Sequence, residues 1–329
     1  MSPHASRRRF LATGFTAALL TKTAPAFAQT QTYKLAHPDT NKHPAQKVAE
    51  RFAAEVSKRT NGRIQINVYP AGTLGSEINI IQGLQTGIVD FAMHTSGYLE
   101  SFVPRIQALD LPFVFKDSAA AQRTLDGEVG KELAGDMLEK NIVHLAWGHY
   151  GWRQVETTDK VIRNAADMQN VKIRIQAGPL FASMFKAVGA VPVVIDAGDV
   201  YIALQQKTVG ACEFPFLAYV TNKIFEVAKH VAKTQHVYNA GALMMSKVKF
   251  AGLSPADQEI VRSAGANQSS YWRTLVAQTD AAFEKQMIAQ GIAVTTTDFN
   301  SFHTAMNSVY AEFKPKYPEL FDKVVGAGA

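Results

Sequence analysis

The strongest constraint on the fold of this chain is the alternation of strand-like and helix-like segments along its first third. Short strand-like segments cover residues 33–36, 64–68 and 88–93. Two amphipathic helical segments lie between them, one opened by Pro44 and one beginning near Ser76, and their apolar residues recur at helical spacing. Because a strand–helix–strand order places successive strands parallel, this part of the chain predicts a mostly parallel sheet covered by helices.

The rest of the chain continues this pattern. Strands are expected at residues 142–147, 171–175, 191–194, 209–214 and 242–246, and helices at 118–140, after Pro179 and at 199–206. A very long helix should run from Ser254 to about Gln290, and a last helix capped at Thr297-Asp298 should leave residues 326–329 loose. The middle third thus repeats the strand–helix alternation of the first third, and two such units predict an α/β fold with two lobes. Each lobe would hold a mixed, mostly parallel sheet flanked by helices, and the long helix would span both.

The first 28 residues have the composition of an export signal. Arg7-Arg8-Arg9 precede a short apolar run, and Ala26-Phe27-Ala28 resembles a cleavage site. The pattern Ser-Arg-Arg-x-Phe-Leu is similar to a twin-arginine signal, and the general secretory route stays open as an alternative. We expect cleavage after Ala28 and a mature protein in the periplasm.

Charge and cysteine content narrow the partners of the mature chain. Export removes four basic residues and no acidic one, so the formal net charge falls from +6 to +2. No basic stripe indicates a nucleic acid partner. Cys212 is the only cysteine, which excludes an internal disulfide and leaves stability to large apolar cores. No later segment is typical of a membrane span.

Arg174 is a candidate for ligand binding. In the strand at residues 171–175, Val171, Ile173 and Ile175 share one face, and Lys172 and Arg174 share the other. Arg174 stands near the carboxyl end of this strand, where open α/β sheets bind ligands. A guanidinium there can hold a carboxylate through two parallel hydrogen bonds. The alternative is an arginine with a purely structural partner.

Two other stretches carry aromatic residues that could line a pocket. His149, Tyr150, Trp152 and Arg153 follow the strand expected at 142–147, where the chain would leave the first unit. They could form a ligand wall or a packed hinge between lobes. Phe214 ends another strand and could cover an apolar part of a ligand or belong to the core.

Catalytic and metal-binding motifs are scarce. His37, Asp39 and His43 could converge on an ion, but Pro38 fixes the backbone between the first two and no H-E-x-x-H signature is present. We therefore expect a structural or ligand-lining role for His37 and no metal. No nucleophile elbow or phosphate loop occurs, so the residues support neither a hydrolase triad nor a nucleotide site.

Five stretches occur in an order that is informative about the family. They are Thr60-Asn61-Gly62-Arg63 with Tyr69-Pro70-Ala71-Gly72, Gly87 with Val89-Asp90-Phe91, Leu109-Asp110-Leu111-Pro112-Phe113-Val114-Phe115, Val171-Lys172-Ile173-Arg174, and Val200-Tyr201 with Ala203-Leu204-Gln205. Over nearly the whole mature chain, their order and spacing resemble the solute-binding subunits of tripartite ATP-independent periplasmic (TRAP) transporters, the DctP-type family.

This resemblance implies a receptor with no catalysis and no cofactor. Its two lobes would close on an organic acid and deliver it to a small and a large membrane subunit. Lobe I would comprise residues 29–151 and about 240–279, and lobe II about 152–239 and 280–329. The family's carboxylate-binding arginine falls on Arg174 and its second ligand arginine near Arg153.

Other lining positions of the family fall on Ser76, Glu77, Thr95 and Ala197. Phe214 stands where the family often has an asparagine, and Ala197 and Thr95 replace larger or charged residues of some relatives. These departures favour a monocarboxylate with an apolar or aromatic body, a 2-oxo or 2-hydroxy acid, with walls from His149, Tyr150, Trp152 and Phe214. Two alternatives stay open: a binding protein of an ABC importer or sensor, and an exported metal-dependent enzyme.

Overall fold

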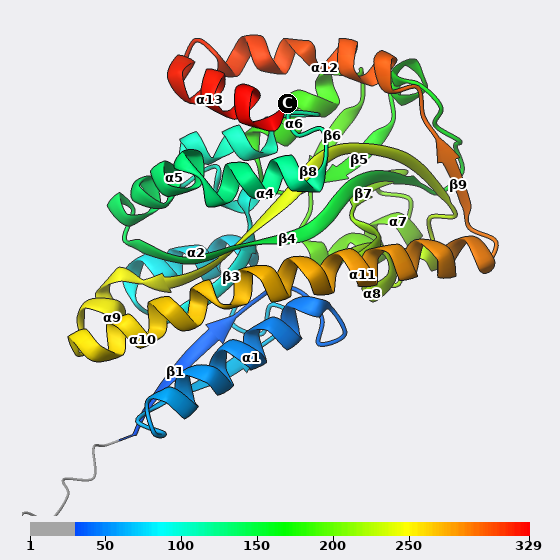
Figure 1. Ribbon diagram of the computed structural model, residues 1–329. Coiled ribbons are helices and arrows are strands. Elements are labelled where there is room, and N and C mark those ends of the chain that lie inside the picture. Colours follow the sequence, from blue (N-terminus) through cyan, green and yellow to red (C-terminus); the bar gives the residue numbers. More distant parts are fainter. Residues whose placement is uncertain (1–29) are drawn as a thin grey trace, which may run out of the picture.

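The computed structural model describes residues 30–329, so the predicted export signal and its cleavage after Ala28 lie outside the described residues. Nine strands form one continuous sheet in the order β2-β1-β3-β8-β4-β7-β5-β6, with β9 paired to β8 (Figure 1). The strands are β1 (Gln31–Ala36), β2 (Ile64–Tyr69), β3 (Phe91–Thr95), β4 (Ile142–Thr157), β5 (Lys172–Ile175), β6 (Val191–Val194), β7 (Ala211–Phe214), β8 (His230–Ser246) and β9 (Ala293–Thr296).

Helices cover both faces of this sheet. They are α1 (Pro44–Arg59), α2 (Glu77–Thr86), α3 (Ser96–Leu99), α4 (Ser118–Asp126), α5 (Glu128–Glu139), α6 (Pro179–Ala187), α7 (Val200–Gln205), α8 (Phe216–Thr221), α9 (Lys247–Ala251), α10 (Pro255–Ala266), α11 (Gln268–Ala289), α12 (Phe299–Phe313) and α13 (Pro318–Gly328). Short 3₁₀ turns, including η1 (Pro104–Asp110), complete the chain. No helix of residues 30–329 is both long and apolar enough to cross a membrane.

Two long antiparallel strands join the lobes. β4 has 16 residues and β8 has 17, and they pair along most of their length. β1, β2 and β3 attach at one end of this ribbon and form lobe I. β5, β6, β7 and β9 attach at the other end and form lobe II. Both lobes contain parallel and antiparallel pairs, so the predicted two-lobed α/β fold is confirmed. The lobe boundaries stay a prediction.

The prediction of short strands at 142–147 and 242–246 was wrong. Both strands extend through the middle of the molecule and are buried almost throughout. Burial on both faces removes the apolar–polar alternation that marks a strand in sequence. Residues His149 to Arg153 therefore lie inside β4, where the pairing register shifts between His149 and Trp152.

The predicted long helix consists of α10 and α11, separated only by Asn267. Figure 1 shows this pair running across both lobes. It approaches the sheet at Gly148 and Gly241, which are paired across β4 and β8. A Cβ atom on Gly148 would lie 2.1 Å from the ring of the buried Trp272. Because neither glycine has a side chain, Trp272 of α11 can pack directly against the sheet at this point.

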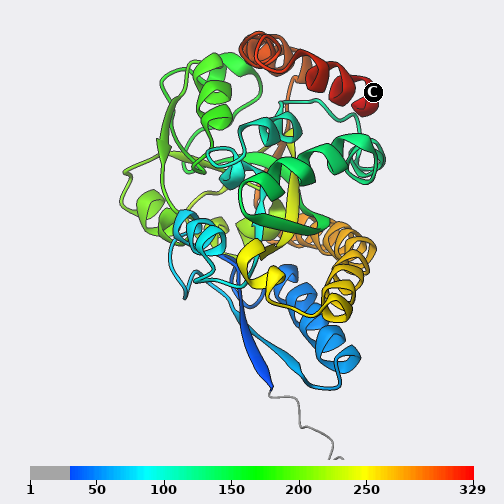
Figure 2. The same ribbon diagram turned by 90° about the vertical axis from the view of Figure 1, so that its left-hand side faces the viewer.

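Two smaller predictions were also wrong. The segment at 118–140 forms two helices that break at Gly127 rather than one. The C-terminal residues are ordered in α13, where the Gly328 carbonyl accepts a 3.0 Å hydrogen bond from the Lys116 amide. β1 and the C-terminal helices lie at opposite ends of the molecule (Figure 2).

Candidate ligand-binding site

A small cavity lies between the lobes at the carboxyl ends of four strands. β1 and β3 lead to it from lobe I, through Asp39 and Thr95, and β5 and β7 lead to it from lobe II, through Gln176 and Phe214. Its volume is about 40 Å³ at this degree of lobe closure. The lining residues are Pro38, Asp39, His43, Glu77, Thr95, Tyr98, Tyr150, Arg153, Gln176, Ala197, Phe214, Pro215, Ala218, Asn222 and Asn239. The cavity therefore occupies the edge of the sheet at which ligand binding was expected.

Arg174 is fully buried and does not itself line this cavity, but it contacts Tyr98 and Phe214, which do. Its Nε donates to the Ile195 carbonyl at 2.7 Å, and its Nη2 donates to the Tyr98 hydroxyl at 3.1 Å. Its Nη1 is buried and has no hydrogen-bond partner among residues 30–329. The guanidinium lies 4.6 Å from the centre of the Phe214 ring, close enough for a cation–π contact. These contacts fix the plane of the guanidinium and leave one nitrogen for an anion.

Arg153 is held differently, because Glu213 binds it. Its Nε pairs with the Glu213 carboxylate, and its Nη2 donates to the Glu213 backbone carbonyl at 2.7 Å. Burial alone would raise the pKa of Glu213, but Arg153 and His236 lower it below its ordinary value. Arg153 is thus part of a buried ion pair that lines the cavity, and it is less free than Arg174 to bind a ligand.

Several buried polar atoms around the cavity have no hydrogen-bond partner among the described residues. Besides Arg174 Nη1, they are Nε2 of Gln176, Nε2 of His43, Oδ2 of Asp39 and Oδ1 of Asn239. Buried polar groups are normally paired, so a group of them at one cavity calls for a ligand or water that pairs them. The set contains both donors and acceptors, which suits a molecule that carries hydroxyl groups.

Burial shifts the pKa values of the histidine and the aspartate at this site in the direction that disfavours their charged forms. Burial lowers the pKa of His43 to about 3, and the ring stacks on Tyr150 with centroids 5.4 Å apart. Burial raises the pKa of Asp39 to about 6. His37 is fully buried, pairs with Gln46 at 2.9 Å and does not line the cavity. Within residues 30–329, no three side chains of the metal-ligating types are grouped so as to hold an ion.

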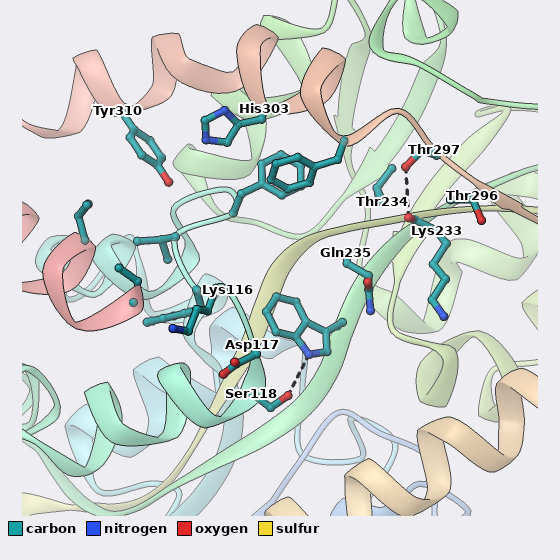
Figure 3. Close-up of a pocket in the computed structure, with 18 residues that line it drawn as sticks. Lys116, Asp117, Ser118, Lys233, Thr234, Gln235, Thr296, Thr297, His303 and Tyr310 are labelled. Carbon is teal, nitrogen blue, oxygen red and sulfur yellow. Dashed lines mark hydrogen bonds between the residues drawn. The ribbon is translucent and has the colours of Figure 1, made fainter.

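The structure separates the aromatic residues predicted to form one wall. Tyr150 and Arg153 line the cavity, whereas Trp152 faces the opposite side of β4. Trp152 lines a larger groove of about 800 Å³, where its indole nitrogen donates to Ser118 at 3.0 Å (Figure 3). His149 stacks on Tyr238, with ring centroids 4.0 Å apart, and lines neither the cavity nor the groove. Among residues 30–329, the larger groove is lined by Lys116 and Lys233 but by no arginine, so only the smaller cavity offers a guanidinium to an acid.

The other predicted site residues divide between the cavity and its surroundings. Glu77, Thr95 and Phe214 line the cavity, as does Ala197. Ser76 does not, because its side chain caps α2 by accepting the Asn79 amide. Glu77 accepts a hydrogen bond from the Ala197 amide, and Thr95 donates to Gln176 at 3.2 Å.

Several contributors were not predicted from the sequence. Gln176, Tyr98 and Asn239 line the cavity without having been singled out, and Glu213, which binds Arg153, was noted without a partner. A buried glutamate at the carboxyl end of a strand, as in Glu213-Phe214-Pro215, was the one available signal, because a buried charge needs a counter-charge.

Comparisons with known proteins agree with this geometry. The family model for bacterial extracellular solute-binding protein, family 7 (DctP), matches residues 35–316. The 2,3-diketo-L-gulonate-binding periplasmic protein YiaO of Escherichia coli is 33% identical over 276 residues, which cover 83% of this chain and 84% of that protein.

Solved structures show the same similarity. A TRAP periplasmic solute-binding protein from Sulfitobacter sp. NAS-14.1, with bound β-D-galacturonate, superposes with a TM-score of 0.87 at 32% identity, covering 91% of this chain and 100% of the other. A TRAP protein from Bordetella bronchispeptica, whose ligand density was interpreted as pantoate, has a TM-score of 0.87 at 28% identity, covering 92% and 100%. With a family match over most of its length, this chain belongs to the DctP family of extracellular solute-binding proteins, and it is a TRAP-type solute receptor rather than an enzyme.

Proposed function

We propose that this protein is the periplasmic receptor of a TRAP transporter and binds a polyhydroxylated monocarboxylic acid of the hexuronate class. Arg174 would hold the carboxylate, and the polar atoms across the cavity would pair with the hydroxyl groups. The single observation that carries this proposal is the set of buried, unpartnered donors and acceptors around the cavity.

The polar lining distinguishes this proposal from the apolar acid that the sequence favoured. An apolar body would leave Asp39, Gln176 and Asn239 buried without partners, and each unsatisfied group costs about 1–3 kcal/mol. A hydroxylated ring would pair with them instead. The relatives that bind β-D-galacturonate and 2,3-diketo-L-gulonate support this class.

A smaller 2-hydroxy acid with an apolar body is the second candidate. Phe214 and Pro215 give one side of the cavity an apolar surface, and the cavity itself is small. The relative with pantoate assigned to its density supports this class. The predicted aromatic wall contributes only Tyr150 and Phe214 to the cavity, so its support for an apolar ligand is weaker than expected.

Binding would proceed by lobe closure. An acid first meets the guanidinium in lobe II, and closure then brings Asp39, Glu77 and Thr95 of lobe I onto its other side. Removing water strengthens the charged hydrogen bonds in the closed site. The small and large membrane subunits would receive the acid from the closed receptor, after export and cleavage following Ala28.

A ligand screen on the purified mature protein tests the proposal. Thermal shift followed by calorimetry would compare D-galacturonate, D-glucuronate, pantoate and a C4-dicarboxylate, with methyl galacturonate as the matched compound that lacks the charge. We expect the two hexuronates to bind most tightly and the methyl ester to bind at least tenfold more weakly, since one charged hydrogen bond contributes about 1.5–3 kcal/mol. Preferential binding of pantoate would favour the second candidate, and binding of the dicarboxylate alone would refute both.

A further inference from the structure

Tyr98 connects the candidate carboxylate site to the contact between the lobes. Its hydroxyl accepts from Arg174 Nη2 at 3.1 Å and lies 3.3 Å from Glu77 Oε1, to which it donates. The same Glu77 oxygen accepts the Ala197 amide at 3.1 Å. Arg174, Tyr98, Glu77 and Ala197 therefore form one continuous hydrogen-bonded chain.

This hydrogen-bonded chain crosses between the lobes twice. Tyr98 follows β3 and Glu77 begins α2, both in lobe I, whereas Arg174 belongs to β5 and Ala197 follows β6, both in lobe II. The bonds from Arg174 to Tyr98 and from Ala197 to Glu77 can form only when the lobes are together. All donors and acceptors of this hydrogen-bonded chain are protein atoms, so none of its bonds is made to a ligand.

The residues around this chain have little room to rearrange. Tyr98 is 5% and Glu77 is 4% exposed. Gly97, beside Tyr98, approaches lobe II so closely that a Cβ atom on it would lie 2.0 Å from Gln176 Nε2 and 2.9 Å from the Phe181 ring. The turn that carries Tyr98 is thus pressed directly against lobe II.

Glu77 brings an acidic group close to another one across this contact. Burial and the neighbouring Glu77 raise the pKa of Asp196, which precedes Ala197. Lobe closure thus brings the carboxyl groups of Glu77 and Asp196 near each other, where they repel. The hydrogen bonds that Tyr98 and Ala197 donate to Glu77 offset that repulsion. A phenylalanine at position 98 would remove one of these donors and also the acceptor for Arg174.

We propose that Tyr98 is a positioning residue that couples carboxylate capture by Arg174 to lobe closure, through the chain Arg174–Tyr98–Glu77–Ala197. The proposal rests on the assignment of Arg174 to the ligand carboxylate. Tyr98 orients the guanidinium and stabilises the closed conformation at the same time, and the apparent affinity for any acid depends on the fraction of closed-competent protein.

The test is Tyr98→Phe in the mature protein, measured by calorimetry and by inter-lobe distance. Calorimetry would use D-galacturonate, D-glucuronate and pantoate, or whichever of them the wild type binds. We expect Kd to rise about tenfold, and by a similar factor for each acid, since the loss of one hydrogen bond to a charged group is about 1.4 kcal/mol or more. A change confined to acids with one particular hydroxyl would indicate direct ligand contact and would overturn the positioning role.

The inter-lobe distance would be measured by pulsed electron paramagnetic resonance between two spin labels, one on Lys58→Cys in α1 and one on Lys186→Cys in α6. Both positions are exposed, and the native Cys212 is buried. Without ligand, Tyr98→Phe should move the distance distribution toward the open form. An unchanged distance distribution would refute the coupling. The distance measurement needs no ligand, so a wild type that binds none of the acids would refute the proposed function and leave this test intact.

Two further variants control the experiment. Tyr219→Phe removes another buried tyrosine hydroxyl, one that donates to the Ala228 carbonyl at 2.6 Å within lobe II, and should change neither Kd nor distance. The double variant Tyr98→Phe with Glu77→Ala should lose less affinity than the sum of the single losses, because both act through one chain. Additive losses would show that the two residues act separately and would contradict the proposal.

Discussion

Replacing Arg174 by lysine tests whether the geometry of the guanidinium, rather than its charge, binds the ligand. In the structure, Nε and Nη2 are occupied by the Ile195 carbonyl and the Tyr98 hydroxyl, and Nη1 faces no protein partner among residues 30–329. Lysine retains the positive charge, but its single ammonium cannot serve both of these partners and a carboxylate at once.

The magnitude follows from the bonds that are lost. A hydrogen bond to a charged group contributes about 1.5–3 kcal/mol net, so losing one at the carboxylate raises Kd roughly 10- to 100-fold. The Ile195 carbonyl or the Tyr98 hydroxyl would also lose a buried partner, which lowers stability by about 1–3 kcal/mol.

Calorimetric titration with D-galacturonate would measure the affinity of Arg174→Lys, and circular dichroism would establish that the variant is folded. Arg123→Lys in α4 makes the same exchange at an exposed position and should bind like the wild type. If Arg174→Lys binds within twofold of the wild type, charge alone suffices and the argument from the guanidinium geometry is wrong.

Three further variants test packing and electrostatics. Gly148→Ala places a methyl group 2.1 Å from the Trp272 ring and should lower the unfolding free energy measured in urea by about 1–3 kcal/mol. At Gly135 an added methyl group would have no atom of residues 30–329 within 4 Å, so Gly135→Ala should stabilise α5 by up to about 1 kcal/mol. Equal effects of the two variants would contradict the packing argument. Phe214→Leu removes the ring 4.6 Å from Arg174 and should weaken hexuronate binding about fivefold in calorimetry, the equivalent of about 1 kcal/mol, and unchanged binding would mean that the cation–π contact is unimportant. Burial raises the pKa of Asp280 to about 7, so its contribution to stability is complete below about pH 4 and is lost as pH rises through 7. Between pH 5 and 8, the unfolding free energy of the wild type should therefore fall about 3 kcal/mol further than that of Asp280→Asn, and parallel pH profiles would refute this.

The sequence predicted those features that depend on neighbouring residues. The strand–helix alternation of the first third, the helix start near Ser76, the helix from Ser254 and the cap at Asp298 appear in the structure close to their predicted places. Arg174 was recognised because the alternation of its strand separates two faces within five residues. Such patterns reflect the geometry of a single helix or strand, which is why the chain displays them without its tertiary contacts.

The arrangement of residues 149–153 shows where this local information ends. Gly151 has a φ of +104°, and the register of β4 shifts beside it, so Tyr150 and Arg153 face the cavity while Trp152 faces the opposite groove. The four neighbouring side chains looked like one wall in sequence because a register shift depends on the partner strand.

Partnerships between distant residues were decided only by the tertiary structure. Glu213 lies 60 positions from Arg153, and Tyr98 lies 76 positions from Arg174. Nothing in either local sequence specifies these pairs, because the first forms where β7 pairs with β4 inside lobe II, and the second forms only when the two lobes meet. The sequence thus determined most of the elements, the family and the arginine most suited to an acid, whereas strand pairing and lobe contact decided which buried charges and hydroxyl groups lie near the site.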